Sequence, residues 1–349
     1  MTADLFSESA SDDPKPGKEA GKDLIKRVEA IRDQAQSRKK PPSLLPEKHQ
    51  QKDFFVADLM DYAFKDDSAT MDAPLFSLSM KTDKEIFTWQ SADGSRFVEV
   101  APSAFGRATM FDKDMLIFLA SQITEARNQG MDVARTVRFT AHDFLVTTNR
   151  DTSKNGYKGM KDALTRLRGT TIRTNIKTGG KETTSIFGLI ESAEIITDDR
   201  NGRMESVEVT ISQWLWQALE AYEVLTIDPA YFRLSKPMER RLYEIARKHV
   251  GQQGLWEIGL DTLWKKTGSL SELKKFKHQL KQIIADDLVP QYRIALQDED
   301  KVTFYDRQQD KVAKAMLTKL SKRNPAGRPS QQSTTADHAQ SDNEEQEKR

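Results

Sequence analysis

The chain has 349 residues, of which 37% are hydrophobic and 31% charged, a length sufficient for roughly two to three domains with separate cores. No cysteine is present, which excludes disulfides, cysteine-ligated zinc fingers and a cysteine nucleophile. No run reaches the ~18 consecutive apolar residues of a membrane span, and the N-terminus is acidic and polar, so we expect a cytoplasmic protein without a signal peptide.

Both ends of the chain are predicted to be disordered. Residues 1–52 are rich in charge, proline and serine, and residues 321–349 contain almost no apolar side chains. Within the N-terminal arm, Leu5 and Phe6 form an isolated apolar pair. Apolar anchors on disordered arms commonly dock on a partner, so this pair is a candidate partner-binding site. The alternative is an inert tail.

The first folded domain is expected to open with strands and a helix. Apolar alternation predicts strands around residues 76–80, 87–89 and 98–100, the last two joined by a turn at Asp93-Gly94. An amphipathic helix is predicted over roughly 112–129, with Asp112 as its N-cap.

One pattern then occurs twice, at RFTAHDFLVTT (138–148) and at EIGLDTLWKKT (257–267). In each copy a short strand precedes a helix, and a loop leads to a second helix with apolar residues at positions i, i+4 and i+7. These residues are Met160, Leu164 and Leu167 in the first copy and Phe276, Leu280 and Ile283 in the second. A β-hairpin is expected after each second helix, pairing 170–176 with 184–190 and 291–297 with 301–306. This is the outline of a winged helix, so the predicted fold is α+β with two tandem winged-helix domains, 53–223 and 224–320.

The segment between the two copies is expected to join the domains. It contains a predicted strand at 207–212 and predicted helices at 213–222 and 236–249. The last helix is expected to bury Met238, Leu242 and Ile245 and to expose Arg240, Arg241, Arg247 and Lys248. Because no Pro/Gly linker separates the domains, we expect them to pack together through a shared helix.

The formal net charge is only +1, but positive charge is concentrated on the repeated pattern. Residues 150–181 carry nine Lys/Arg against two Asp, and residues 265–281 carry six Lys against one Glu. Local charge is what a phosphate group experiences within a Debye length. Helical geometry turns these basic side chains away from the core, where they suit a DNA major groove. The alternative is the solvated face of an ordinary amphipathic helix, but the same face occurs twice.

The candidate DNA-binding residues lie on these helices and on the first hairpin. They are Lys154, Lys158, Lys161, Thr165, Arg166, Arg168, Lys177, Lys181, Lys265, Lys274, Lys275, Lys277, His278, Lys281 and Gln282. The tip of the second hairpin, QDEDK (297–301), is acidic and is expected to be repelled by DNA. His142 and Asp261, at the start of the first helix in each copy, are interpreted as helix caps rather than as catalytic groups.

Enzyme signatures are missing from the sequence. No G-x-x-x-x-G-K-[ST] occurs, which argues against a P-loop ATPase or helicase. The five histidines are scattered, so the sequence offers neither an H-E-x-x-H site nor the clustered ligands of a metal-dependent nickase. We therefore expect a binding protein without catalytic residues, metal or cofactor.

Six segments strongly resemble the plasmid replication initiator protein A family. They are APSAFGRATMFDKDMLIFLASQITEARNQG (101–130), VRFTAHDFL (137–145), YKGMKDALTRLRGTTIRTNI (157–176), VLTIDPAYFRLS (224–235), ERRLYEIARKHVG (239–251) and GSLSELKKFKHQLKQI (268–283). The resemblance covers roughly residues 70–306 and implies a Rep-type initiator with two winged-helix domains. Such a protein binds direct repeats (iterons) at a plasmid origin and helps to open the adjacent AT-rich DNA.

The resemblance also implies roles for particular parts of the chain. Residues 273–284 match the family's principal recognition helix. The host initiator, the replicative helicase and a second copy of the chain are the implied partners, with plasmid copy control and autorepression by a dimer. The long N-terminal arm departs from the family's pattern, so no function of residues 1–52 is carried over.

Other functions fit part of these features. A transcriptional regulator with tandem winged helices would share the DNA-binding residues without opening DNA or recruiting replication proteins. A nickase-type replication enzyme would need a nucleophile and metal ligands that the sequence lacks. Residues 2–6 (TADLF) also resemble the end of the short motif by which bacterial replication proteins bind the sliding clamp, although the usual upstream Gln is missing. The clamp is therefore a further candidate partner for Leu5 and Phe6.

Overall fold

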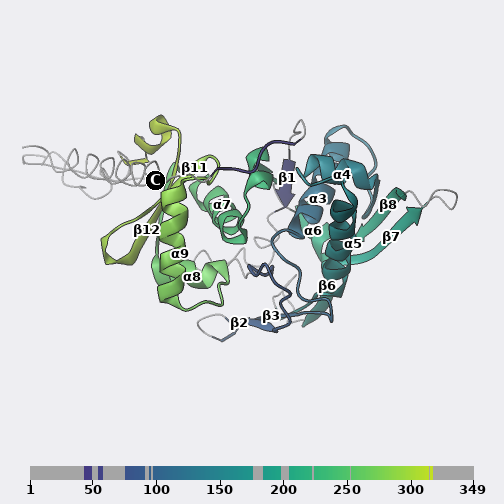
Figure 1. The fold of residues 1–349 in the computed structure, drawn as a ribbon, viewed down its shortest axis with the longest axis horizontal. Helices are drawn as coiled ribbons and strands as arrows, with labels where there is room; N and C mark the ends of the chain where they lie inside the picture. Colours follow the sequence, from purple (N-terminus) through teal and green to yellow (C-terminus); the bar gives the residue numbers. More distant parts are fainter. Residues whose placement is uncertain are drawn as a thin grey trace, which may run out of the picture.

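The computed structural model describes residues 43–48, 54–57, 75–90, 94–95, 97–175, 184–197, 204–221, 224–251, 253–313 and 315–316. These residues form two modules that lie side by side (Figure 1). Their buried apolar side chains form two clusters, one running from Leu75 to Leu219 and the other from Ile227 to Phe304 with the addition of Ile117. We call residues 75–221 the first module and residues 224–313 the second module.

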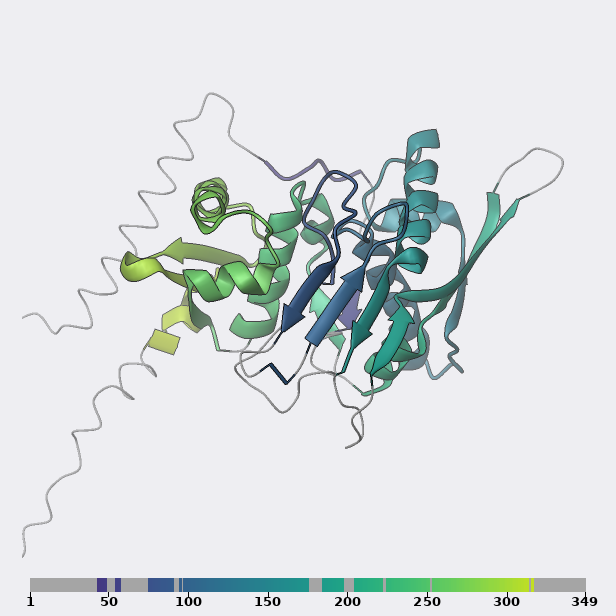
Figure 2. The same cartoon turned by 90° about the horizontal axis from the view of Figure 1, so that it is seen from below.

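The first module contains two antiparallel sheets, with strand orders β2-β3-β5-β6 and β4-β8-β7, packed with four helices among its described residues. The four-stranded sheet runs across the face turned to the viewer in Figure 2. The elements in chain order are β2 (Phe87–Gln90), β3 (Phe97–Ala101), α3 (Lys113–Asn128), β4 (Thr136–Phe139), α4 (Ala141–Thr147), α5 (Lys154–Gly169), β5 (Thr171–Thr174), β6 (Ser185–Gly188), β7 (Ile190–Thr197), β8 (Met204–Ile211) and α6 (Gln213–Ala221).

The second module is smaller and has one three-stranded sheet of order β10-β12-β11. Its first strand, β9, pairs instead with β1 (Phe54–Ala57), which lies near the N-terminus in sequence. The elements are β9 (Val224–Ile227), η1 (Pro229–Arg233), α7 (Pro237–Val250), β10 (Leu255–Gly259), α8 (Leu260–Thr267), α9 (Leu273–Asp286), β11 (Tyr292–Leu296), η2 (Asp298–Asp300) and β12 (Lys301–Asp306).

The two second helices of the repeated pattern are α5 and α9, and their predicted buried faces are confirmed. Met160, Leu164 and Leu167 are at most 3% exposed, as are Phe276, Leu280 and Ile283. Spacings of three and four residues place each set on one side of its helix, where it packs into the core of its own module.

The predicted strand at 76–80 is wrong, because this segment forms only an isolated bridge between Ser77 and Thr109. The Ser77 hydroxyl donates to the Asp83 carboxylate (2.5 Å) and accepts from the Ser79 N–H (3.1 Å). Such local side-chain hydrogen bonds compete with strand pairing. Met80, predicted to alternate into the core, is 72% exposed.

Of the predicted helix caps, Asp112 does occupy the N-cap position of α3, whereas the caps predicted at His142 and Asp261 are wrong. Thr140, not His142, caps α4, and its hydroxyl accepts from the Asp143 N–H (3.1 Å). Asp261 forms an ion pair with Lys265 one turn further along α8 (2.8 Å). Asp112 precedes α3, but no helix N–H bonds to its side chain. Its carboxylate accepts instead from Arg166 and from the Thr109 N–H.

The hairpin after α5 forms as predicted but does not occupy the position expected of a wing. β5 pairs with β6 from Thr171–Gly188 to Thr174–Ser185, and β5 also pairs with β3. The strand before α4, β4, pairs with β8 of a second hairpin, β7–β8, which projects from the edge of the molecule (Figures 1 and 2). In the second module, β10 pairs with β12 in the corresponding way. By topology, β7–β8 is therefore the counterpart of β11–β12.

The two modules are packed together as expected, and α3 belongs to both, since Ile117 lies in the second core. Arg240 and Arg241 of α7, predicted to be exposed, are only 3% and 8% exposed. Both guanidinium groups are buried because they have partners: Arg240 binds Asp114 of α3, and Arg241 donates to the Lys266 carbonyl (2.8 Å).

Within the N-terminal arm, which the sequence predicts to be mostly disordered, residues 43–48 are ordered and make hydrogen bonds with both modules. The remainder of that arm, including Leu5 and Phe6, and residues 317–349 lie outside the described residues, as does the tip of the β5–β6 hairpin with Lys177 and Lys181.

Candidate nucleic-acid interface

The exposed face of α9 is basic. Lys274, His278 and Lys281 recur at positions i, i+4 and i+7 and are exposed, opposite the buried apolar face. Gln282 and His278 are joined by a hydrogen bond between their side-chain nitrogens (3.1 Å). Neither Lys274 nor Lys281 has an ion pair or hydrogen bond with any described residue, so both ammonium groups are available to an external anion.

The α8–α9 loop fixes where this face begins. Gly268 ends α8 in the left-handed region (φ 73°), a conformation that glycine adopts without strain. The Trp264 indole N–H donates to the Ser271 carbonyl (2.9 Å) and holds the loop against α8. These contacts fix the direction of α9 relative to α8.

Other predicted residues on α8 and α9 have intramolecular partners. Lys277 is paired with Asp300 of η2, in the acidic turn of the β11–β12 hairpin, and Lys265 with Asp261. Lys275 is exposed and lines a cavity of about 560 Å³ between the modules, together with Gln279 and Gln282. The polar face of α9 is thus divided between open solvent, the acidic turn and this cavity.

Residues from both modules line the cavity. Ser77 and Met80 lie on the side of the first module, and Arg107 also lines it. The Arg107 Nη2 group donates to Asp83 (2.7 Å), whereas its buried Nε and Nη1 groups have no hydrogen-bond partner among the described residues. Burial lowers the pKa of this guanidinium, and the Asp83 carboxylate opposes that shift.

The α5 helix presents the corresponding face of the first module. Lys154, Lys158, Lys161 and Thr165 are exposed, and the three lysines make no ion pair with any described residue. A Cβ at Gly156 would lie 1.6 Å from the Asp151 carbonyl oxygen, so the tight turn into α5 accepts only glycine there. In Figure 1, α5 and α9 both lie on the side turned to the viewer.

The two arginines of α5 differ. Arg168 is exposed, whereas Arg166 is half-buried and forms a bidentate ion pair with Asp112 (2.7 Å for both bonds). The hydrogen bonds that Arg166 donates to the Asp112 carboxylate raise the pKa of Arg166 above its usual value. Arg166 therefore fixes α5 against the start of α3, and any contact with an external anion would have to compete with that pair.

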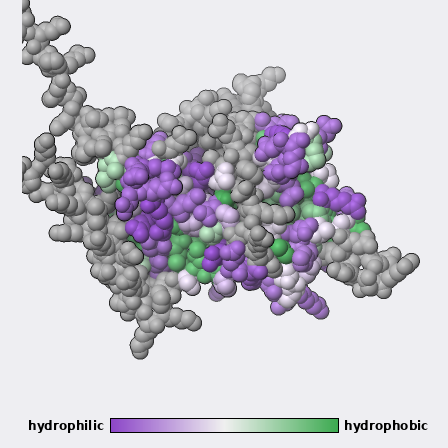
Figure 3. Space-filling model, turned by 90° about the horizontal axis from the view of Figure 1, so that it is seen from above, coloured by the Kyte–Doolittle hydropathy of each residue, from purple (hydrophilic) through white to green (hydrophobic). Residues whose placement is uncertain are grey.

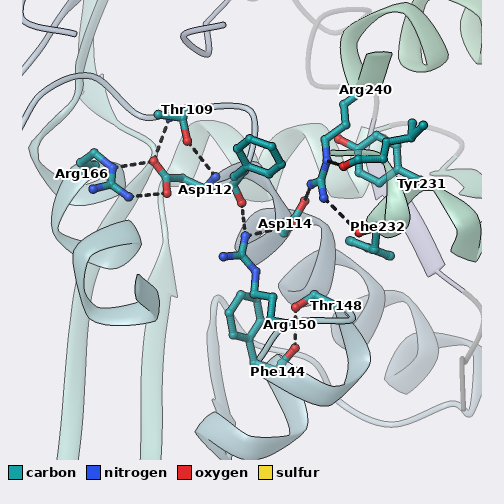
Figure 4. A network of polar contacts seen from close by, with 12 residues as sticks. Thr109, Asp112, Asp114, Phe144, Thr148, Arg150, Arg166, Tyr231, Phe232 and Arg240 are labelled. Carbon is teal, nitrogen blue, oxygen red and sulfur yellow. Dashed lines mark hydrogen bonds and ion pairs between the residues drawn. The ribbon is translucent and has the colours of Figure 1, made fainter. Parts of the chain in front are cut away.

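A network at the start of α3 connects α5, the α4–α5 turn and the second module (Figure 4). Asp114, which is 1% exposed, accepts hydrogen bonds from Arg150 (2.9 Å) and from Arg240 (2.5 Å). The Arg240 guanidinium also lies over the rings of Phe111 (4.4 Å) and Tyr231 (5.0 Å). Burial disfavours its charge, but the Asp114 carboxylate more than compensates, so the pKa of Arg240 is raised.

The model of the replication initiator protein A family matches residues 65–294. The chain belongs to this family. A protein of Wigglesworthia glossinidia brevipalpis named "Putative replication protein" is 36% identical over 262 residues, which are 73% of this chain and 94% of that protein. A crystal structure of domains 2 and 3 of RctB has a similar fold, with a TM-score of 0.51 at 13% identity, covering 72% of this chain and 98% of that one.

The segment matched by the replication initiator family includes both α5 and α9. Where residues are coloured in the view from above in Figure 3, the surface of the initiator is mostly hydrophilic, with smaller apolar patches. Among the described residues no group of His, Asp and Glu is arranged to hold a metal ion, and no helix is long and apolar enough to cross a membrane.

The sequence did not reveal the α3 network. Its signal is the placement of Asp114 at the start of a helix whose next six residues, MLIFLA, are all apolar. A carboxylate at a position that is buried needs a cationic partner, and that requirement points to an arginine elsewhere in the chain.

Proposed function

We propose that this replication initiator binds repeated duplex sites at a plasmid origin, with α5 and α9 as its two DNA-reading helices. Acidic residues are as frequent as basic ones in the chain, 53 against 54. Even so, Lys154, Lys158 and Lys161 on α5 and Lys274 and Lys281 on α9 have no partner among the described residues. The proposal rests on these two helix faces with unpaired positive charge, because contacts to phosphate supply essentially all of the non-specific affinity for DNA and a large share of the specific affinity.

Both modules are proposed to be winged helices, within domains at residues 53–223 and 224–320. In this interpretation α8 and α9 form the helix–turn–helix of the second domain and β11–β12 its wing. In the first domain α4 and α5 take the same role, and β7–β8 is the wing. The β5–β6 hairpin, with Lys177 and Lys181 at its tip, is then an insertion that offers a separate phosphate contact.

The initiator is proposed to act by binding rather than by catalysis. Contacts to both modules would position the origin so that the adjacent AT-rich DNA opens and the host initiator and replicative helicase assemble. A self-associated form would repress its own promoter and limit copy number. Leu5 and Phe6 are proposed to contact the host sliding clamp, and unchanged clamp pull-down and copy number after deletion of residues 2–9 would contradict that contact.

The α9 assignment is tested by replacing Lys274, His278 and Lys281 with Ala together. Because each specific base contact contributes about 1–3 kcal/mol, we expect cognate affinity to fall by about 100-fold or more. For an unaltered chain that neutralises about 8 phosphates, log affinity should fall with log salt at a slope near −7. The triple variant should lower that slope by about 2, in fluorescence anisotropy titrations on a repeat duplex.

A charge-preserving variant provides the control. Replacing Lys274 and Lys281 with Arg keeps both positive charges while changing the geometry of the donors. It should therefore retain the salt slope and alter only sequence preference. Unchanged cognate affinity in the triple Ala variant would exclude α9, and a slope shallower than about −3 for the unaltered chain would exclude simultaneous binding by both modules.

A plasmid maintenance assay distinguishes the proposed initiator from the alternative function, a tandem winged-helix transcriptional regulator. The gene is supplied beside its cloned origin on a plasmid that has no other replicon. An initiator sustains the plasmid. A regulator binds the same repeats but yields no transformants.

A further inference from the structure

The N-terminal strap, residues 43–48 (SLLPEK), crosses from one module to the other and is drawn in purple at the top of Figure 1. Its contacts to the second module are reciprocal. The Leu45 N–H donates to the Arg233 carbonyl (2.9 Å), and the Arg233 Nε group donates to the Leu45 carbonyl (2.6 Å). Leu44 packs against the apolar core of the same module.

The other end of the strap is bound to the first module by one side chain. The Lys48 N–H donates to Asn149 Oδ1 (2.7 Å), and Asn149 Nδ2 donates to the Pro46 carbonyl (3.2 Å). Asn149 is 5% exposed and has φ 55°, so its backbone is in the left-handed region directly after α4. The Asn149 side-chain amide is thus positioned to bind the backbone of the strap with both its oxygen and its nitrogen.

Asn149 lies in the turn between α4 and α5, and its neighbour Arg150 is also connected to the second module. Arg150 binds Asp114, which binds Arg240 of α7. Two adjacent residues of one turn therefore join the modules by separate routes, one through α3 and one through the strap. The next residue, Asp151, receives hydrogen bonds from Ser153 at the start of α5, which lower its pKa, and Lys48 of the strap lowers it further.

The two routes differ in how firmly they are held. Asp114 and Arg240 are both almost completely buried, so that route is part of the packed structure. In the strap, only Leu44 is half-buried, and Ser43, Leu45, Pro46, Glu47 and Lys48 are exposed. A segment held by a few backbone hydrogen bonds and one apolar side chain can detach while both cores remain folded.

We propose that the strap is a detachable clip that holds the two modules in one relative orientation. Through the α4–α5 turn, the N-terminal arm then determines how α5 is oriented relative to the second module. Its effect on DNA rests on the proposed function, because a fixed orientation favours binding to two sites at once by reducing the ordering cost. A partner that pulls on the arm, or a cleavage that removes it, would release the α4–α5 turn.

The test measures the distance between the modules in the free protein. The chain contains no cysteine, so His142→Cys on α4 of the first module and Gln309→Cys after β12 of the second, both exposed, accept spin labels specifically. Asn149→Gly keeps the positive φ but removes the amide, and Leu44→Asp removes the apolar anchor without altering either core. Glu47→Gln, a change at an exposed strap residue, is the matched control.

We expect Asn149→Gly and Leu44→Asp each to broaden the distance distribution at least twofold, and Glu47→Gln to leave it unchanged. Affinity for a duplex with two adjacent repeats should fall about 10-fold in the first two variants, with unchanged binding to a duplex that only one module can occupy. Distributions as narrow as in the unaltered chain would overturn the clip. Broadened distributions with unaltered two-repeat affinity would support the clip and contradict simultaneous DNA binding by both modules.

Discussion

Asp114 forms ion pairs with residues of both modules. Its carboxylate is 1% exposed and is shared by Arg150 of the first module and Arg240 of the second. A carboxylate placed in this environment is tolerable only because two guanidinium groups supply its hydrogen bonds and opposite charge. The two guanidinium groups do not compete for one acceptor, since each donates to a different oxygen atom of the Asp114 carboxylate.

Asp114→Asn should therefore destabilise the protein by about 3–5 kcal/mol, because it leaves the buried Arg240 guanidinium without a counter-charge. The free energy of unfolding in urea measures this change. Asp261→Asn is the matched control: it removes one partner of the exposed Asp261–Lys265 pair and should cost at most about 1 kcal/mol. Equal losses in both variants would show that burial of Asp114 does not determine its contribution.

The burial of Arg240 and Arg241 could not be predicted from the sequence pattern. Arg240 and Arg241 lie within an amphipathic helix, and a periodic pattern assigns charged residues to the exposed face. The pattern is correct for Leu242 and Ile245, which are buried. The pattern fails for Arg240 because its partner, the Asp114 carboxylate of α3, is 126 positions away in sequence. No local pattern predicts that α3 and α7 are in contact.

The acidic turn η2 reduces the number of α9 lysines that are free to bind an anion. Asp298, Glu299 and Asp300 lie in the β11–β12 hairpin, and Asp300 is paired with Lys277 of α9. Both side chains are partly exposed, so the pair is screened and exchanges readily with a phosphate. The turn thus competes intramolecularly with DNA for one lysine of the proposed recognition helix.

Asp300→Asn should release Lys277 and raise the affinity for duplex DNA of any sequence by a few fold, with a salt slope steeper by about 0.9. Glu299→Gln removes the same charge from the same turn but leaves the Lys277–Asp300 pair intact. It should raise affinity less and leave the slope unchanged. Identical effects of the two variants, measured by anisotropy at several salt concentrations, would mean that only the net charge of the turn matters.

Hairpins illustrate a second reason why sequence patterns are incomplete. Alternation and turn residues predicted β5–β6 correctly, because strand pairing within a hairpin is local. They did not predict that β4 pairs with β8, since that register joins Phe139 to Val207 across two helices and another hairpin. Local signals specified the elements, whereas long-range pairing decided which hairpin stands beside the helix–turn–helix.

The two modules are joined by a short linker and by several packed contacts. Only residues 222 and 223 lie between α6 and β9 in the chain. β1 pairs with β9, α3 contributes Ile117 to the second core, and the Asp114–Arg240 pair is buried between them. Together with the strap, which adds contacts to both modules, these contacts present α5 and α9 at one separation and one relative angle.

This rigidity makes a prediction about DNA spacing. If α5 and α9 bind two adjacent sites on one duplex, inserting 5 base pairs between those sites rotates one by about half a turn of a duplex with ~10–10.5 base pairs per turn. Affinity should then fall to the level of a single module. Inserting 10 base pairs restores the rotation but adds about 34 Å of separation, which two linking residues cannot span, so affinity should stay equally low. Electrophoretic mobility shifts on the three duplexes check this result, and recovery of affinity at 10 base pairs would require modules that move apart on DNA.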